Sequence, residues 1–127
     1  MRIDVLTLFP NMFSAYLDES ILRRAQSAGL LDLRIHNIRD FAEGKHRVTD
    51  EPPYGGGGGM VLKPQPIFDA AESVSTGHGE ARPYCILLSP QGRLLTHNVA
   101  TELATKPWLL FLCGRYEGVD ERVREHL

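Results

Sequence analysis

A length of 127 residues suits a single domain that can bury roughly two thirds of the surface its unfolded chain exposes. The apolar fraction of 43% and the charged fraction of 24% are typical of a soluble globular protein, and no apolar run approaches the roughly 20 residues of a membrane span, which argues against membrane insertion. The formal net charge of -2 gives no global sign of nucleic-acid binding.

The N-terminal third predicts a strand, a helical stretch and a second strand. The apolar run from 2 to 9 predicts the first strand, and because it contains an acid and lacks a small-residue cleavage site, we expect a cytoplasmic protein without a signal peptide. A helical stretch follows from about 11 to 28, with breaks allowed, and Gly29 is a natural C-cap. Residues 31 to 36 alternate apolar and polar, which predicts a second strand with one wet face near a sheet edge or under a partner.

The remaining elements follow a long polar stretch from Arg39 to Met60, which we interpret as functional or mobile rather than as a plain connection. The pattern then predicts a helix over 65–75, a polar loop to 82, a strand over 84–88, a helix capped by Thr96 that runs to Leu103, a strand over 108–113 and a terminal helix with Asp120 as its N-cap. Strands that alternate with helices predict an α/β fold with a mainly parallel sheet and helices on both faces.

The cysteines and histidines give no sign of a disulfide or a metal site. Cys85 and Cys113 lie in separate apolar, strand-like runs without a Cys-x-x-Cys pair, so we expect buried reduced thiols. The five histidines lack the spacing typical of zinc sites, and we expect no metal.

Two strand ends repeat one design, in which a buried strand runs into a tight turn. Leu88-Ser89-Pro90-Gln91-Gly92 follows one strand, and Cys113-Gly114-Arg115-Tyr116-Glu117-Gly118 follows the next. Adjacent carboxyl ends of parallel strands would frame one cleft, where backbone groups could bind an adenine edge between apolar walls. For Ser89-Pro90 alone, an ordinary turn is the simpler interpretation.

Glu117 and its neighbours allow several roles. Glu117 could pair with Arg115 or Arg122, accept backbone hydrogens near the start of the helix, accept two donors from a guanine edge, or stabilise a cationic ligand. Arg115 could hold a phosphate or a carboxylate, and Tyr116 could stack on a ligand or donate to it.

Five successive glycines, Gly55 to Gly59, lie between Pro53-Tyr54 and Met60. No phosphate-loop pattern fits the run, because no Gly-Lys-Ser/Thr follows it. The run is either a flexible linker or a backbone surface for the close approach of a nucleobase, and we favour the second because its flanks have the composition of ordered segments.

Charge is uneven along the chain. Between Arg23 and Arg47 six basic residues face three acids, a local balance of +3. Charge alone favours a solvated face over a phosphate-contacting patch.

The chain resembles the bacterial tRNA (guanine-N1)-methyltransferase family, knotted methyltransferases of the SPOUT type that methylate guanosine 37 beside the anticodon. The matching motifs span almost the whole chain: Leu8-Phe9-Pro10-x-Met12-Phe13, Gly29-Leu30-Leu31, Arg39-Asp40-Phe41, His46-Arg47-x-x-Asp50, Pro53-Tyr54-Gly55-Gly56-Gly57-x-Gly59-Met60, Leu88-Ser89-Pro90-Gln91-Gly92 and the run from Cys113 to Arg122. Gly58 is a minor departure from the family pattern.

The resemblance implies a deep trefoil knot, S-adenosylmethionine as the methyl donor, tRNA as the substrate and a homodimer with active sites at the subunit interface. It implies donor contacts from Leu88, Ser89, Pro90, Gly114, Tyr116, Glu117 and Gly118. It implies tRNA contacts from the glycine-rich segment and the basic region, and the substrate-binding residues we expect are Tyr54, Gly55, Gly56, Gly57, Gly59, Arg115, His46 and Arg47.

The family's expected catalytic base, an aspartate, lies beyond the position of Leu127. We therefore expect residues 1–127 to be an N-terminal, donor-binding methyltransferase domain, truncated on its C-terminal side, with an incomplete knot and no methyltransferase activity of its own. The alternative hypothesis is a noncatalytic nucleotide-binding or RNA-binding module.

Overall fold

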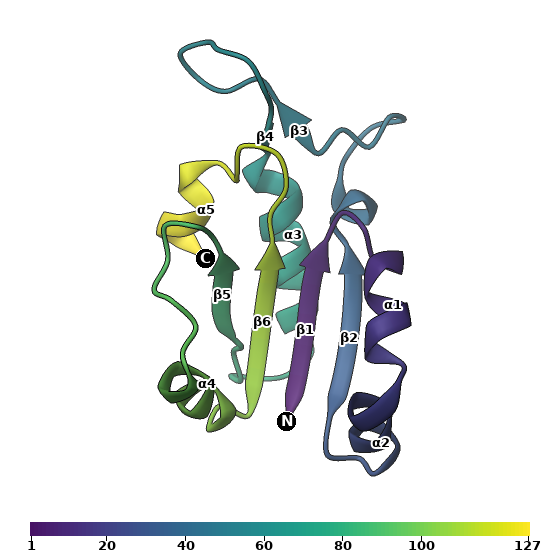
Figure 1. The fold of residues 1–127 in the computed structure, drawn as a ribbon. Helices are drawn as coiled ribbons and strands as arrows, with labels where there is room; N and C mark the ends of the chain where they lie inside the picture. The colour runs from purple at the N-terminus through teal and green to yellow at the C-terminus, as the bar shows by residue number, and fades with distance from the viewer.

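A four-stranded parallel sheet organises the protein, whose computed structural model describes residues 1–127 (Figure 1). Its strands, in spatial order, are β2 (Asp32–Asn37), β1 (Arg2–Thr7), β6 (Trp108–Cys113) and β5 (Tyr84–Leu88). The helices are α1 (Asn11–Leu17), α2 (Ser20–Ser27), α3 (Pro64–Ser75), α4 (His97–Ala104) and α5 (Glu121–His126), with a short 3-10 helix η1 (Ile38–Phe41) and a two-stranded antiparallel sheet of β3 (Asp50–Glu51) and β4 (Val61–Leu62).

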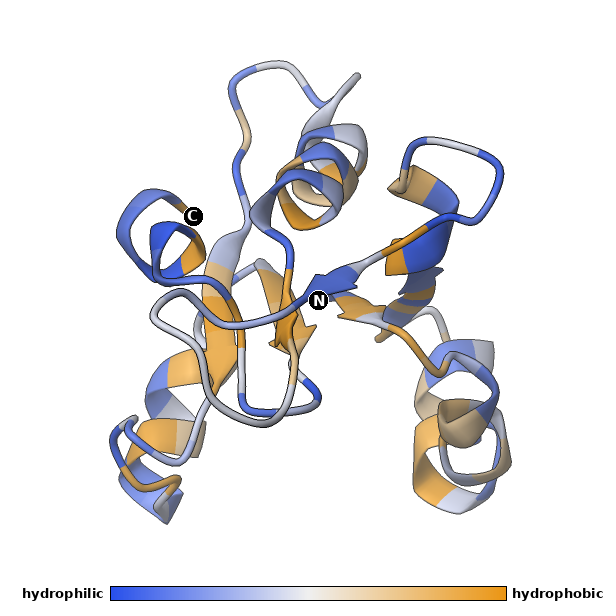
Figure 2. Ribbon diagram, turned by 90° about the horizontal axis from the view of Figure 1, so that it is seen from above, coloured by the Kyte–Doolittle hydropathy of each residue, from blue (hydrophilic) through white to orange (hydrophobic).

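Helices lie on both faces of the main sheet. Seen along the sheet, α3 and α5 lie on one side, and α1, α2 and α4 lie on the other (Figure 2). The predicted α/β class with a mainly parallel sheet is therefore confirmed. All four strands point the same way, so their carboxyl ends meet at one edge of the sheet.

The core lies between α3 and the two central strands. Ile67 and Val74 of α3 pack against Leu6 of β1 and Leu110 of β6, and these four side chains are at most 5% exposed. Full burial of one such side chain stabilises the fold by about 1.5–3 kcal/mol. This packing fixes β1 and β6 side by side and holds the edge of the sheet that carries the functional site.

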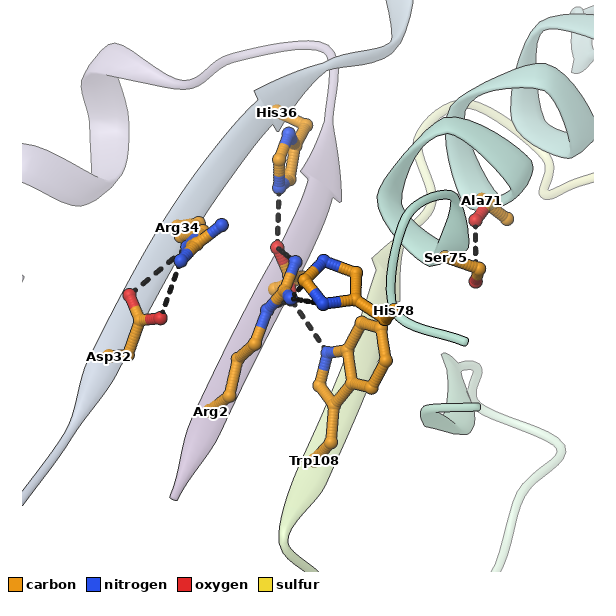
Figure 3. A network of polar contacts seen from close by, with 9 residues as sticks. Arg2, Asp32, Arg34, His36, Ala71, Ser75, His78 and Trp108 are labelled. Carbon is orange, nitrogen blue, oxygen red and sulfur yellow. Dashed lines mark hydrogen bonds and ion pairs between the residues drawn. The ribbon is translucent and has the colours of Figure 1, made fainter. Parts of the chain in front are cut away.

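A buried polar network lies at the amino end of the same sheet (Figure 3). The carboxylate of Asp4 is fully buried and accepts hydrogen bonds from Trp108 Nε1 at 2.7 Å, His36 Nε2 at 2.6 Å and Arg2 Nε at 2.7 Å. His78 contacts Arg2 at 2.7 Å and meets the Trp108 ring edge to face. Burial opposes ionisation of Asp4, but the three hydrogen bonds outweigh it and lower the pKa of this carboxyl to about 2.

The N-terminal helical stretch is divided into α1 and α2, as the prediction of a helix with possible breaks allowed. Glu19 is extended and Ser20 has a φ of +52°, so the helix cannot continue through them. The Gln26 side chain donates to the freed carbonyl of Leu17 at 2.9 Å, which satisfies the end of α1. Ala28 is the C-cap of α2, and Gly29, the residue predicted for this role, follows it with a φ of +70°.

The segment 39–60 has more structure than its polar composition indicates. The segment begins within η1, where Phe41 packs against the core, and its β3 pairs with β4 in the register Asp50 to Leu62. The glycine run therefore lies in the connection between the two strands of a β-hairpin. Two-residue strands are too short for an alternating pattern to reveal them.

The two cysteines are both free thiols. Cys85 packs against the core, whereas Cys113 lies beside Leu88, three residues further along and on the opposite face of the sheet. They cannot form a disulfide without unfolding the sheet, and burial raises the pKa of both thiols. None of the helices combines the length and the apolar composition needed to cross a bilayer.

Candidate functional site

A cleft of about 320 Å³ opens at the carboxyl ends of β5 and β6. The turn after β5 and the turn after β6 form its two walls, and the first turn of α5 closes one side. The structure brings together all seven residues that we expected to contact the donor: Leu88, Ser89, Pro90, Gly114, Tyr116, Glu117 and Gly118. Arg115, which we assigned to the substrate, also lines the cleft.

The turn after β6 lines the cleft and contains backbone donors without a partner in the chain. Gly118 closes this turn by donating to the Arg115 carbonyl at 3.2 Å, with a φ of +126° that favours glycine. The amide groups of Gly114, Arg115 and Tyr116 form no hydrogen bond within the chain. Three successive free N–H groups can therefore donate to a ligand that carries acceptors along one edge.

Tyr116 is held in a conformation that costs energy. Its φ of +61° lies in the left-handed region, which non-glycine residues rarely adopt. Strain of this kind, on the order of 1–2 kcal/mol, is often found where a site needs a side chain in a set position. Here it turns the half-exposed tyrosine toward the cleft that it lines.

The turn after β5 is stabilised by its own serine. Ser89 Oγ accepts the Gln91 amide at 3.2 Å, and the Ser89 carbonyl accepts the Gly92 amide at 3.2 Å. Leu88 ends β5 half-exposed, beside Pro90 on the cleft wall. This wall offers an apolar surface to a flat ring while its polar groups are satisfied locally.

Glu117 does not pair with an arginine. Arg122 instead makes a bidentate pair with Asp120, at 2.7 and 2.8 Å, and this pair lowers the pKa of the aspartate. Asp120 also accepts the Arg122 amide at 3.0 Å, which confirms it as the N-cap of α5. The carboxylate of Glu117 reaches the exit of the glycine-rich segment, where its Oε2 accepts the Met60 amide at 2.8 Å.

Arg115 lies between the cleft and the start of α1. Its guanidinium stacks over the ring of Phe9 at 5.2 Å, and it also lines a smaller apolar pocket with Met12 and Phe13. No carboxylate pairs with Arg115. Its charge therefore remains available to an anion at the mouth of the cleft.

The other expected substrate residues lie outside the cleft. The glycine run projects above the carboxyl edge of the sheet, and Tyr54 beside it is 82% exposed (Figure 1). His46 and Arg47 lie in the exposed loop before β3, where Arg47 pairs with Asp40 at 3.0 Å. All of them are on the same side of the molecule as the cleft mouth, and the Met60–Glu117 contact links the glycine run to it.

The basic residues between 23 and 47 do not form one patch. Arg23 and Arg24 lie on α2, before β2 begins, whereas Lys45 and Arg47 follow its end, and a six-residue strand is roughly 20 Å long. Figure 1 shows α2 at one end of the sheet and the 42–49 loop at the other. Only the C-terminal part of the basic region, with Lys45 and Arg47, therefore lies near the cleft mouth.

Five residues that line the cleft had no role assigned from the sequence: Leu87, Gln91, Val119, Glu121 and Arg124. Gln91 lies within a motif that was recognised without a role for this side chain, and Glu121 and Arg124 form an ion pair one helical turn apart on α5. The i,i+3 spacing predicts that pair, but only the fold shows that this side of α5 faces the cleft.

Known proteins resemble the chain over its whole length. A tRNA (guanine-N(1)-)-methyltransferase of Anoxybacillus flavithermus is 58% identical over all 127 residues, which cover 51% of that relative. The same enzyme of Geobacillus kaustophilus is 57% identical over the same coverage, and that of Dehalococcoides mccartyi is 55% identical. The chain thus spans about half the length of the curated relatives it matches.

A solved structure and a family profile agree with these relatives. The crystal structure of tRNA (m1G37) methyltransferase from Aquifex aeolicus superposes with a TM-score of 0.88 and 38% identity, over 98% of this chain and 56% of that one. The profile of the family described as tRNA (guanine-1)-methyltransferase TrmD matches residues 1–127. The chain belongs to the tRNA (guanine-1)-methyltransferase family.

Proposed function

We propose that the strand-end cleft binds S-adenosylmethionine and that the protein serves the transfer of its methyl group to N1 of guanosine 37 in tRNA. The observation that carries this proposal is the gathering of the seven expected donor-contacting residues around one cleft. A cavity of about 320 Å³ lies within the range of small-molecule sites. S-adenosylmethionine supplies a methyl group made electrophilic by its sulfonium.

The residues of the cleft fit an adenosine-containing ligand. The free amides of Gly114, Arg115 and Tyr116 can donate to the acceptor nitrogens of an adenine edge. Leu88 and Pro90 can contact the faces of the ring and keep water from it. Binding of this kind positions the donor, which is the main source of rate in a direct transfer between two bound molecules.

The acids that line the cleft are already engaged. Glu117 accepts the Met60 amide, and Glu121 pairs with Arg124. Removal of the guanine N1 proton needs a base within hydrogen-bond reach. We therefore propose that the base belongs to the half of the relatives' length that this chain does not match, and that residues 1–127 bind the donor without methylating tRNA.

On the substrate side, we propose that tRNA approaches the cleft mouth over the glycine-rich segment. Tyr54 offers an exposed ring on which a base can stack, and His46 and Arg47 offer donors to phosphates. Arg115 has no carboxylate partner and lies closest to the cleft, so it can meet the phosphate of the target nucleotide. We propose that the role of the protein is tRNA modification in the cytoplasm.

We also propose that the protein is a homodimer. α1 has no buried residue and exposes Met12 and Tyr16, at 72% and 77%, and α2 exposes Ile21 at 69%. An exposed apolar surface of this kind often marks a protein interface. Sedimentation of the wild type against the pair of substitutions Met12→Lys and Tyr16→Lys tests this, and a wild-type monomer would contradict it.

Calorimetric titration with S-adenosylmethionine tests the donor site. Gly114→Leu should abolish binding, because Gly114 lines the cleft and a leucine there competes with the ligand for space beside Val119, whose Cγ1 lies 3.7 Å from a Cβ at this position. The φ of Gly114 lies outside the left-handed region, so the substitution adds no backbone strain. Asn98→Leu on the exposed side of α4 is the control and should bind as the wild type does. Equal binding by Gly114→Leu and the wild type would exclude this cleft, and binding of an anticodon stem-loop without any donor binding would favour a noncatalytic RNA-binding module.

A further inference from the structure

The exit of the glycine-rich segment is attached to the cleft wall at one residue pair. Glu117 Oε2 accepts the Met60 amide at 2.8 Å, and the Glu117 amide donates to the Met60 carbonyl at 3.2 Å. Both the side chain and the backbone of Glu117 thus hold the same residue. Met60 is the first residue after the five glycines.

This pair continues a short ladder between two segments far apart in the sequence. Leu62 donates to the Gly118 carbonyl at 3.0 Å, and its own carbonyl accepts the Asp120 amide at 3.0 Å. Leu62 is fully buried, so this part of the ladder is stable. The Glu117 carboxylate extends this ladder to Met60, where the exposed glycine run ends.

Gly59 differs from the rest of the run in what surrounds it. A Cβ at Gly59 would lie 2.3–2.5 Å from three atoms of the Glu117 carboxyl group, closer than any real contact. Gly55, Gly56, Gly57 and Gly58 have nothing within 4 Å of such an atom. Glycine at position 59 therefore leaves the space that the Glu117 carboxylate occupies.

We propose that Glu117 is a positioning residue that anchors the glycine-rich loop, residues 55–59, to the cleft and couples the order of this loop to ligand binding there. Glu117 lines the cleft and lies one residue after Tyr116, which also lines it and whose amide has no partner within the chain. A ligand that fixes the Gly114–Gly118 turn therefore also fixes the carboxylate that holds Met60. The coupling rests on the proposed function, because the ligand is S-adenosylmethionine. It must be reciprocal: an ordered loop favours donor binding by the same free energy with which the bound donor favours the ordered loop.

Hydrogen exchange of the ligand-free chain tests the anchor. Glu117→Ala should speed exchange of the Met60 amide about tenfold, the effect of losing one hydrogen bond to a charged acceptor. Glu117→Gln keeps one carbonyl acceptor and should restore much of the protection. Thermal unfolding of each variant separates this local effect from a loss of global stability.

A pair of glycine substitutions separates the collision with the Glu117 carboxylate from the effect of backbone strain. Gly59 and Gly57 have φ values of +100° and +119°, so alanine is strained at both, but only at Gly59 does it meet the carboxylate. Gly59→Ala should speed Met60 exchange as Glu117→Ala does, whereas Gly57→Ala should not. In the Glu117→Ala background Gly59→Ala should add nothing further, because the colliding group is gone. Equal effects of the two glycine substitutions, or unchanged Met60 exchange in Glu117→Ala, would overturn the anchor.

The coupling is tested by adding S-adenosylmethionine, with binding followed by calorimetry. In the wild type the donor should slow exchange across 56–60 several-fold. In Glu117→Ala, measured at a donor concentration that calorimetry shows to saturate this variant, it should not. Donor binding to the wild type without slower exchange would overturn the coupling and leave the proposed donor site intact. Absence of donor binding to the wild type would overturn the proposed function and the coupling together, while the ligand-free comparison still decides the anchor.

Discussion

Replacement of Asp4 by asparagine removes the charge at the centre of the buried polar network while keeping the shape of the side chain. The carboxylate accepts from Trp108, His36 and Arg2, and its two oxygens divide these donors between them. Asparagine keeps one oxygen acceptor and presents an amino group in place of the other. At least one of the three donors therefore loses its acceptor in the variant.

The pKa of Asp4 sets the expected size of the effect. Folding lowers it from 3.8 to about 2, and each pKa unit corresponds to about 1.4 kcal/mol. The ionised carboxylate thus stabilises the folded state by about 2 kcal/mol. Because the folded-state pKa is the lower one, this contribution is fully present above pH 4 and is lost as the pH falls from about 4 toward 2.

Urea unfolding followed by far-ultraviolet circular dichroism measures the difference at pH 7 and pH 3. We expect Asp4→Asn to lower the free energy of unfolding by about 2 kcal/mol at pH 7 and by roughly half as much at pH 3. Trp108 is the sole tryptophan, and coincidence of its fluorescence transition with the dichroism transition checks two-state behaviour.

The exposed pair of Asp32 and Arg34 on the neighbouring strand provides the control. Asp32 is half-exposed and meets Arg34 at 2.8 Å, so Asp32→Asn should change the free energy of unfolding by less than about 0.5 kcal/mol. If Asp4→Asn were as stable as the wild type at pH 7, or if its deficit were the same at pH 3, the buried charge would not stabilise the fold as argued.

The remaining predictions concern the cleft, the thiols and the reaction. Tyr116→Gly removes the left-handed strain and should raise the free energy of unfolding by about 0.5–1 kcal/mol while weakening donor binding in calorimetry; a less stable variant would show that Tyr116 is not strained. Because burial raises the pKa of the Cys85 and Cys113 thiols, a thiol reagent at pH 7 should label the folded chain far more slowly than the urea-unfolded chain, and equal rates would contradict their burial. Incubation of residues 1–127 with tRNA and methyl-labelled donor should give no methyl incorporation, and incorporation at guanosine 37 comparable to that of a full-length relative would place a working base within this chain.

Features that depend on neighbouring residues, such as helix ends and caps, could be predicted from the sequence. Gly29 ends a helix, and Thr96 and Asp120 cap the helices that follow them, because each role depends only on residues within one turn. The five-residue and six-residue apolar strands β5 and β6 were predicted with their bounds for the same reason. Their shared edge then followed from the parallel arrangement.

Contacts between distant residues could not be predicted in this way. The Met60–Glu117 contact joins residues 57 positions apart, and the Trp108–Asp4 contact joins residues 104 positions apart. The sequence suggested nearby arginines as partners of Glu117, but Asp120 takes Arg122 and the fold brings the Met60 amide instead. The basic residues between 23 and 47 do not gather in one patch, because the length of β2 separates those on α2 from those in the loop before β3.

The position of β1 in the middle of the sheet has a consequence for synthesis on the ribosome. β1 pairs with β2, only 30 residues later in the chain, but its other neighbour is β6, and Arg2 lies in register with Trp108. At roughly 5–20 residues per second, β6 is made about 5–20 s after β1. During that interval one edge of the central strand β1 has no native partner, so the nascent chain exposes an unpaired strand edge until residues 108–113 emerge.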